Sequence, residues 1–234
     1  MATQLSQEIY KLDTRISNVY LVKNDSGAIL VDSGYFLERP LIIYQLRRLL
    51  GAGKRLTAVL ITHAHPDHDG NLNAITSRFG GDIYMDEKEI PYAKNPRRVD
   101  LSKMDALGFP DRIIFKTMTR IAPVQSISAV DWNESWKEQF GITAIPTPGH
   151  TPGSCCYMHH PSKTLFTGDA LLTALPPWTV KQKICLPSAI YSTDYEQALT
   201  SVKNITELNF SALCTGHGHP ILEDASQKVY AAMY

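Results

Sequence analysis

The sequence has no excess of charge of either sign. Its 234 residues include 23 Lys and Arg and 23 Asp and Glu, so the formal net charge at pH 7 is zero. A balanced chain produces no long-range field that would attract nucleic acid, an anionic membrane or an acidic partner. A nuclease would need a local basic patch, for which the segment KNPRR at 94–98 is the one candidate. We therefore expect a small-molecule substrate, with neither nucleic acid nor membrane as a partner.

Long apolar segments are also lacking. No run approaches the roughly 18 apolar residues that a membrane-spanning helix needs. The first residues, MATQLSQEIYKLDT, contain neither the basic n-region nor the apolar h-region of a secretory signal. The sequence therefore predicts a cytoplasmic protein. The number of subunits stays open, with a homodimer as one possibility.

Cysteine is scarce: the chain has Cys155, Cys156, Cys185 and Cys214. None of them forms a C-x-x-C pair, and the adjacent Cys155 and Cys156 should point to opposite faces of a strand. We interpret all four as small core residues of a protein from a reducing compartment, in preference to a disulfide framework.

Hydrophobic residues, by contrast, make up 44% of the sequence, which is enough for a well-buried core. Segments rich in Val, Ile, Leu and Tyr alternate with segments of helical spacing, and this order occurs twice. It predicts a single α/β domain over residues 1–234, with two packed mixed β-sheets and helices on their outer faces. The predicted strands are EIYKLD, NVYLVKN, AILVDSG, LTAVLIT, DIYM, FGITAIPTPGH, GSCCYMHH, TLFTGD and FSALCTGHG, and the predicted helices are RPLIIYQLRRLLGAG, NLNAITSRFG, TDYEQALTSVKNITELN and EDASQKVYAAMY.

Some element ends have local signals. Gly51 is a plausible stop for the first long helix, and Thr193 with Glu196 has the spacing of a capping box. The nearly unbroken apolar run LTAVLIT predicts a strand that is buried on both faces. His159 and His160 precede a turn at PSK, so we expect both on the surface.

Residues 86 to about 128 break this pattern, because they mix charge, proline, methionine and short helical pieces. We interpret them as a lid-like insertion. Part of it should pack on the sandwich, and part should roof an apolar pocket together with the loop at 171–179, where Trp178 either walls the pocket or simply packs. The alternative is a small satellite core. The apolar residues of the insertion are Ile90, Tyr92, Met104, Leu107, Phe109, Ile113, Phe115 and Met118.

The segment THAHPDHDG at 62–70 is the strongest chemical signal. Neutral imidazole and carboxylate are ligands for divalent metals such as zinc. His63 and His65 are two residues apart, so they lie on the same side of an extended segment, and Asp67 and His68 follow directly. One metal cannot comfortably take four groups from so short a loop. Two neighbouring metals can, with His63 and His65 on one and Asp67 and His68 on the other.

Three later blocks repeat the layout of a strand followed by a polar, glycine-containing loop: IPTPGHTPGS, LFTGDA and LCTGHGHP. They offer His150 for the first metal, His217 for the second and Asp169 as a bridge, while His219 competes with His217. Such a pair of metals holds a bridging water of lowered pKa and polarises a carbonyl or phosphoryl group. Asp67 could both bind metal and hold the attacking hydroxide.

Five motifs in this order resemble the metallo-β-lactamase superfamily. They are VDSG (31–34), HAHPDH (63–68), TPGHTPGS (147–154), FTGDA (166–170) and TGHG (215–218). The resemblance implies an αββα sandwich and a hydrolytic two-metal centre. It also implies that Asp32 supports the metal loops from outside the ligand set, and it favours His217 over His219.

Departures from known members narrow the expected activity. The stretch after Asp169 lacks the GCGR-like sequence of glyoxalase II and persulfide dioxygenase relatives, and Leu172 stands where lactonases of this fold often place a tyrosine. TPGHTPGS looks like subclass B3 β-lactamases, which lack the bridging aspartate. The arm and basic surface of RNase Z-like enzymes are not evident.

We therefore expect a hydrolase with two divalent metal ions, foremost Zn²⁺ with Fe or Mn as alternatives. A metal-bridging hydroxide would cleave a small ester, lactone or thioester. The alternatives are a mononuclear iron dioxygenase of the persulfide dioxygenase type, a β-lactamase-like hydrolase and a sensor without catalysis.

Overall fold

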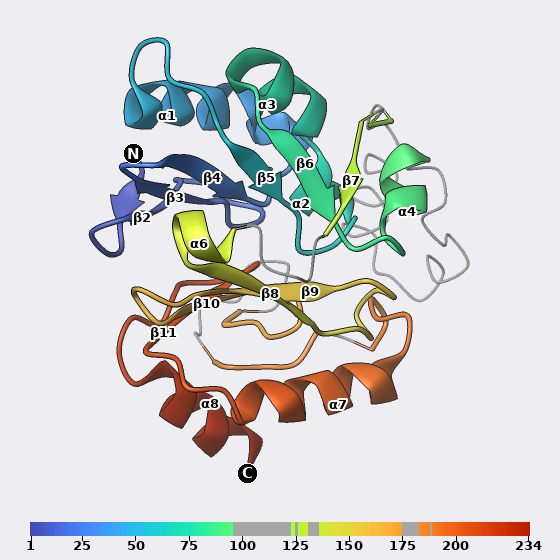
Figure 1. Cartoon of the computed structure of the whole chain (residues 1–234). Coiled ribbons are helices and arrows are strands. Elements are labelled where there is room, and N and C mark those ends of the chain that lie inside the picture. Colours follow the sequence, from blue (N-terminus) through green and yellow to red (C-terminus); the bar gives the residue numbers. More distant parts are fainter. Residues whose placement is uncertain (96–122, 125, 131–135, 175–182, 188) are drawn as a thin grey trace.

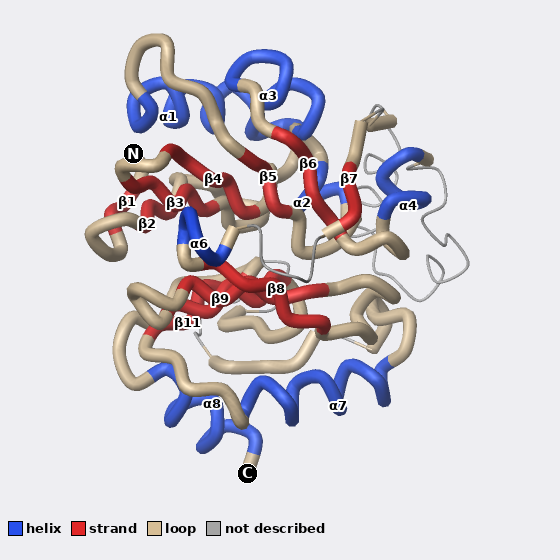
Figure 2. Tube along the Cα trace, in the orientation of Figure 1, coloured by secondary structure: helices blue, strands red, loops and turns tan. Residues whose placement is uncertain are grey.

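Two β-sheets lie face to face in the computed structural model, with helices on both outer sides (Figure 1). The structure describes residues 1–95, 123–124, 126–130, 136–174, 183–187 and 189–234. The tube in Figure 2 shows the same layers, with the strands inside and the long helices above and below them. This arrangement confirms the predicted fold class. The assignment of residues 1–234 to a single domain stays a prediction.

The first sheet has the order β1-β2-β3-β4-β5-β6-β7. Strands β1 to β4 pair antiparallel and β4 to β7 pair parallel, so the sheet is mixed. Its outer face is covered by α1 and α3. The elements are β1 Thr3–Gln4, β2 Ile9–Lys11, β3 Tyr20–Asn24, β4 Gly27–Val31, the 3-10 helix η1 Phe36–Glu38, α1 Arg39–Leu50, β5 Ala58–Leu60, α2 Pro66–Asp69, α3 Leu72–Phe79, β6 Asp82–Met85, α4 Ile90–Lys94 and β7 Ser128–Ala129.

The second sheet has the order β11-β10-β9-β8 and is also mixed, because only β10 and β11 pair parallel. Helices α7 and α8 cover its outer face (Figure 1). Its elements are α6 Lys137–Phe140, β8 Ile142–Pro146, β9 Cys155–His159, β10 Thr164–Gly168, α7 Tyr195–Thr206, β11 Ala212–Thr215 and α8 Ala225–Met233.

Three apolar layers hold this stack together. Because side chains alternate across a strand, Leu60 of β5 packs between the sheets while Val59 packs against α1 and α3. Strand β9 does the same, with Cys155 between the sheets and Cys156 under α7 and α8. These positions confirm that β5 is buried on both faces and that the adjacent cysteines point apart. All four cysteines are free thiols.

Helix ends follow local chemistry. Gly51 ends α1 with a positive φ of 84°, as the sequence predicts. The capping box at Thr193 is wrong by one residue: Asp194 is the N-cap of α7, and its side chain accepts a hydrogen bond from the backbone N–H of Gln197 at 3.0 Å. Aspartate is as good a cap as threonine, and the backbone of Asp194 has the extended geometry of an N-cap residue.

The expectation of a surface position is confirmed for His160 and wrong for His159. His159 is fully buried, with Nδ1 2.6 Å from Ser162 Oγ and Nε2 3.2 Å from a carboxylate oxygen of Glu8. A buried imidazole is tolerated where polar partners face it: Ser162 lies within hydrogen-bond distance of Nδ1, while Nε2 faces Glu8 at ion-pair distance without a hydrogen bond. Here those partners lie on the turn that follows β9 and on the chain just before β2.

The segment at 86–128 is described only at its two ends. Ala93 of α4 and Val124 are buried in the core between the first sheet and its covering helices, and β7 adds to the edge of that sheet. These ends pack on the sandwich, as expected. The remaining residues of the segment, among them Phe109 and Met118, lie outside the described residues, as does Trp178.

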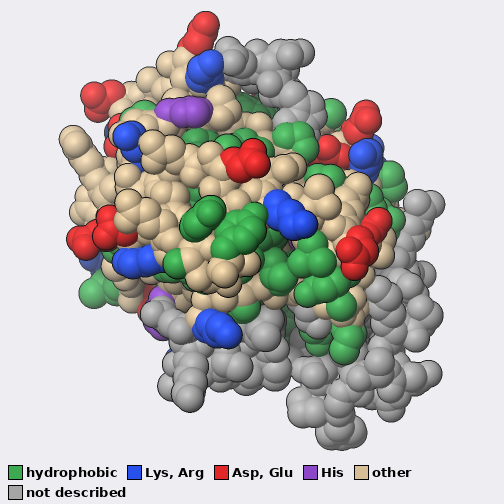
Figure 3. All heavy atoms as spheres, turned by 90° about the horizontal axis from the view of Figure 1, so that it is seen from below, with side chains coloured by type: hydrophobic (Ala, Val, Ile, Leu, Met, Phe, Trp, Pro, Cys, Tyr) green, Lys and Arg blue, Asp and Glu red, His purple; other side chains and the backbone are tan. Residues whose placement is uncertain are grey.

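Charge on the face made by α7 and α8 is mixed. Lys and Arg are interspersed with Asp and Glu there, and the described side chains of neither sign gather into a patch (Figure 3). Within the described ranges, every helix is too short or too polar to cross a membrane.

Candidate metal centre

The loops that follow strands of both sheets meet at one end of the sandwich. The loop after β5 leads into the one-turn helix α2, and the other loops follow β8, β10 and β11. Strand ends are rigid, so they can fix the positions of side chains on such loops. The seven predicted site residues all lie there: His63, His65, Asp67, His68, His150, Asp169 and His217.

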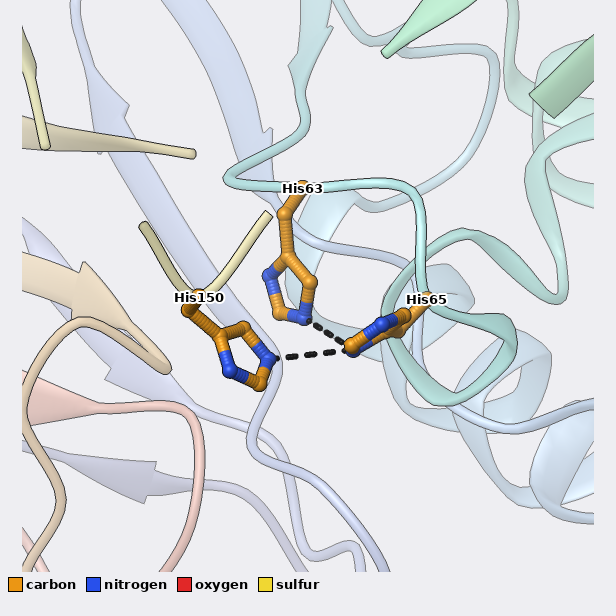
Figure 4. A group of neighbouring side chains, drawn as sticks. All are labelled: His63, His65 and His150. Carbon is orange, nitrogen blue, oxygen red and sulfur yellow. Dashed lines mark hydrogen bonds between the residues drawn. The ribbon is translucent and has the colours of Figure 1, made fainter. Parts of the chain in front are cut away.

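Three histidines form the first group, in which nitrogen atoms point toward one another (Figure 4). His65 Nδ1 lies 3.0 Å from His63 Nε2 and 3.0 Å from His150 Nε2. His63 and His150 are buried and His65 is partly buried. Three converging imidazole nitrogens match the ligand set of many zinc sites.

The second group consists of Asp67, His68 and His217. Asp67 Oδ2 lies 3.2 Å from His217 Nε2 and 3.6 Å from His68 Nε2. Their ligand atoms all lie within 4.8 Å of one another, and all three residues are buried. The group therefore has the size and chemistry of a second metal site.

Asp169 lies between the two groups. Its Oδ1 is 3.4 Å from His68 Nε2, while its Oδ2 is 3.3 Å from His217 Nε2 and 3.7 Å from His150 Nε2. One carboxylate therefore faces nitrogens of both groups, which is the placement that a bridging ligand requires.

Electrostatics separate the two groups. Burial, together with the neighbouring histidines, lowers the pKa of His63 well below its usual value and that of His150 to about 3. Burial also lowers the pKa of His65. These imidazoles are therefore neutral at pH 7, which is the form that binds metal.

The second group is charged without metal. Burial alone would lower the pKa of His217, but Asp169 and Asp67 outweigh it and raise that pKa to about 10. Burial is likewise outweighed at His68, whose pKa lies well above its usual value because of Asp67, Asp169 and Asp32. Burial would raise the pKa of both Asp67 and Asp169, yet the two histidines hold it below the usual value. A metal cation bound at this group would displace the protons that His68 and His217 carry on Nε2.

Contacts outside the ligand set orient the rings. Asp32 Oδ2 accepts a hydrogen bond from His68 Nδ1 at 2.8 Å, and its Oδ1 accepts one from the backbone N–H of Thr62 at 2.8 Å. The backbone carbonyl of Ile16 accepts from His217 Nδ1 at 2.7 Å. In both rings the other nitrogen, Nε2, is thereby turned toward the centre.

Two buried atoms of the centre lack hydrogen-bond partners among the described residues. They are Nε2 of His68, in the second group, and Oδ1 of Asp169, which lies between the groups. Buried polar atoms are normally satisfied, and an unsatisfied one is often explained by an ion. Because these atoms belong to the converging groups, the residues fit a pair of divalent cations. His219 is exposed and does not join them, whereas His217 does.

The sequence did not indicate the role of residues 16–18. Besides the Ile16 carbonyl, the hydroxyl of Ser17 donates to the backbone carbonyl of Asp67, and Asn18 Nδ2 donates to that of Thr215 at 2.8 Å. These contacts involve backbone atoms, so no side-chain pattern could have pointed to them.

A comparison with known protein families shows to which family this chain belongs. The sequence profile of the Metallo-beta-lactamase superfamily matches residues 12–217, which covers all seven residues of the centre. The chain belongs to the metallo-beta-lactamase superfamily. As a member of this superfamily it is a metal-dependent hydrolase.

Individual members of the superfamily are distant relatives. The probable metallo-hydrolase YflN of Bacillus subtilis (strain 168) is 27% identical over 236 residues, covering 93% of this chain and 86% of YflN. The hydroxyacylglutathione hydrolase GloC of Haemophilus influenzae is 26% identical over 170 residues, covering 70% and 71%. The crystal structure of a metallo-beta-lactamase family protein from Thermus thermophilus, TTHA1429, matches with a TM-score of 0.71 at 23% identity, covering 97% and 79%.

Proposed function

We propose that this chain is a hydrolase with two metal ions, in which His63, His65 and His150 hold one ion and Asp67, His68 and His217 hold the other. Asp169 would bridge them. The observation that carries the proposal is the position of Asp169, whose two oxygens face nitrogens of both groups. Zinc is the ion that best suits imidazole and carboxylate ligands, with iron or manganese as alternatives.

Two bound divalent cations would supply a water of lowered pKa and polarise the substrate's carbonyl. The chain's own residues would control the geometry of that attack. Asp67 has its Oδ2 between His68 and His217, so its carboxylate is placed to orient a water by hydrogen bond. Burial of the ligands keeps bulk water from competing for these contacts.

The proposed substrate is a small ester, lactone or thioester. GloC is named as a hydrolase of an acylated glutathione, which is one substrate of this kind. The balanced charge of the chain favours a small molecule over nucleic acid.

Metal analysis and a substrate panel test the proposal together. Protein purified without chelator should contain about two transition-metal ions per chain and should hydrolyse members of a panel of esters, lactones, thioesters, phosphodiesters and a β-lactam. One tightly held iron and no second metal would favour the dioxygenase alternative. Two ions with no turnover on any carbonyl substrate would contradict the proposed substrate class.

A further inference from the structure

Glu89 is a buried carboxylate that contacts both loops of the three-histidine group. Only 1% of the residue is exposed. Its Oε2 accepts a hydrogen bond from the backbone N–H of Ala64 at 2.7 Å, and its Oε1 accepts one from that of Gly153 at 2.7 Å. Ala64 separates His63 from His65, so one oxygen of Glu89 holds the backbone between these two histidines.

The other oxygen holds the loop of His150. This loop is closed on itself, because the N–H of Gly149 donates to the carbonyl of Thr151 at 3.0 Å and the N–H of Thr151 donates to Ser154 Oγ at 3.0 Å. A shift at Gly153 is therefore passed on to His150. The two loops belong to different sheets, since Ala64 follows β5 and Gly153 precedes β9. Glu89 thus ties one sheet to the other beside the first group.

Glu89 is itself held in place. Its N–H donates to the carbonyl of Asp86 at 3.0 Å, and its carbonyl accepts from the N–H of Ala93 in α4 at 3.1 Å. Ala93 is buried in the core of the first sheet. A Cβ atom on Gly153 would lie 2.6 Å from Asp86 Oδ1 and 2.9 Å from Glu89 Cγ, so a glycine here leaves room for the close approach of both side chains.

We propose that Glu89 is a positioning residue of the metal centre, which sets the separation of His63 and His65 from His150 and places a negative charge beside the first ion. This inference rests on the proposed function. Hydrogen bonds from N–H groups to an ionised carboxylate are stronger than neutral ones. Removing a partner of this kind, outside the ligand set, typically costs 10–100-fold in metal affinity or activity.

Glu89→Gln tests the proposal, because an amide keeps the size but has one acceptor oxygen and no charge. Titration with zinc against a competing chelator should show the first ion bound about 10–100-fold more weakly and the second ion unchanged. Turnover should fall in kcat more than it rises in KM. The matched control is Glu87→Gln, which removes the same charge from an exposed position two residues away and should leave both affinities unchanged.

Amide hydrogen exchange on metal-free protein tests the two hydrogen bonds without any dependence on activity. The amides of Ala64 and Gly153 should be protected in the wild type and should exchange faster in Glu89→Gln. Should that variant not fold, Glu89→Asp can replace it. Aspartate keeps the charge but is too short to reach both amides, so this variant should show the same loss of amide protection.

The outcomes separate this inference from the proposed function. A wild type that binds fewer than two ions would contradict the proposed function, while amide exchange would still decide whether Glu89 holds the loops. Unchanged exchange at Ala64 and Gly153, an unchanged first affinity, or equal weakening of both ions would overturn the role of Glu89.

Discussion

At the scale of single residues, the seven side chains of the centre differ in charge rather than in burial. His63, His65 and His150 are neutral because burial depresses the pKa of each ring, and neighbouring histidines add to this effect at His63 and His150. His68 and His217 are kept protonated by Asp67 and Asp169. Substitutions in the two groups should therefore have different consequences.

Asp67→Asn should separate metal binding from catalysis. The amide keeps an oxygen for the metal and loses the charge that orients an attacking water, so we expect kcat to fall on the order of 10²-fold or more while two ions stay bound. Steady-state kinetics together with metal content would measure this. Near-normal turnover with both ions bound would show that Asp67 does not control the nucleophile.

Asp169→Ala should weaken the two ions unequally. The first ion keeps three histidines, whereas the second keeps Asp67, His68 and His217 but loses the carboxylate that lies 3.3–3.4 Å from two of their nitrogens. We expect metal titration of the variant to show one affinity near the wild-type value and one clearly lower. Asp169→Asn, which keeps one ligand oxygen, is the matched control. Two unchanged affinities would place Asp169 outside the ligand set.

At the scale of elements, α7 links helix stability to the metal centre. The backbone N–H groups of Thr193 and Asp194, just before the helix, donate to the carbonyls of His150 and Gly149 at 2.9 Å each. The N-terminal end of α7 therefore supports the loop that carries His150.

Asp194→Ala should reduce the free energy of unfolding by about 1 kcal/mol, because it removes the side-chain cap of Gln197 N–H. Thr193→Ala is the control; its side chain is exposed and should change stability by less than about 0.5 kcal/mol. Urea unfolding of the metal-loaded variants measures both. A larger loss in Thr193→Ala would restore the capping box that the sequence suggested.

At the scale of the whole molecule, ligands from both sheets meet at one rim, so metal binding should also stabilise the sandwich. Without metal, protonated His68 and His217 face the carboxylates of Asp67 and Asp169 at this rim, so the protein's stability becomes dependent on pH through its buried titratable groups.

Metal-free protein should lose stability as the pH rises from about 7.5 to 9. His217, with a pKa raised from 6.5 to about 10, keeps its proton in the folded state over this range while the unfolded chain has mostly lost it. Burial raises the pKa of Asp69 to about 8, so this group also makes the free energy of unfolding fall with rising pH until it loses its proton. The histidines with lowered pKa still bind protons in the unfolded chain near pH 6.5 and oppose the fall there, but above about pH 7.5 they are neutral in both states and add almost nothing.

Melting temperatures of chelator-treated protein at about pH 7.5, 8.2 and 9.0 would test this, with zinc-loaded protein as the control. The control should show a smaller fall, because metal replaces the protons of His68 and His217. A melting temperature of the metal-free protein that rises over this range would contradict the charge assignment.

The sequence by itself determined the layers and the chemistry of the rim. Apolar periodicity is a local property, so the strand of Val59 and Leu60 could be predicted as buried on both faces. The histidines and aspartates could be assigned to two groups because each follows a predicted strand. Their metal ligation stays a prediction, although the structure brings all seven together.

Only the tertiary structure decided which distant groups meet. His159 stands in a stretch typical of a surface turn, yet it is buried beside the carboxylate of Glu8, which is far away in the sequence. The choice of His217 over His219 had only a family resemblance behind it until the ring was seen to donate to the carbonyl of Ile16. Glu89 has no motif around it, because its partners are backbone N–H groups that every sequence has. Such contacts depend on how two sheets pack, which no local pattern of residues records.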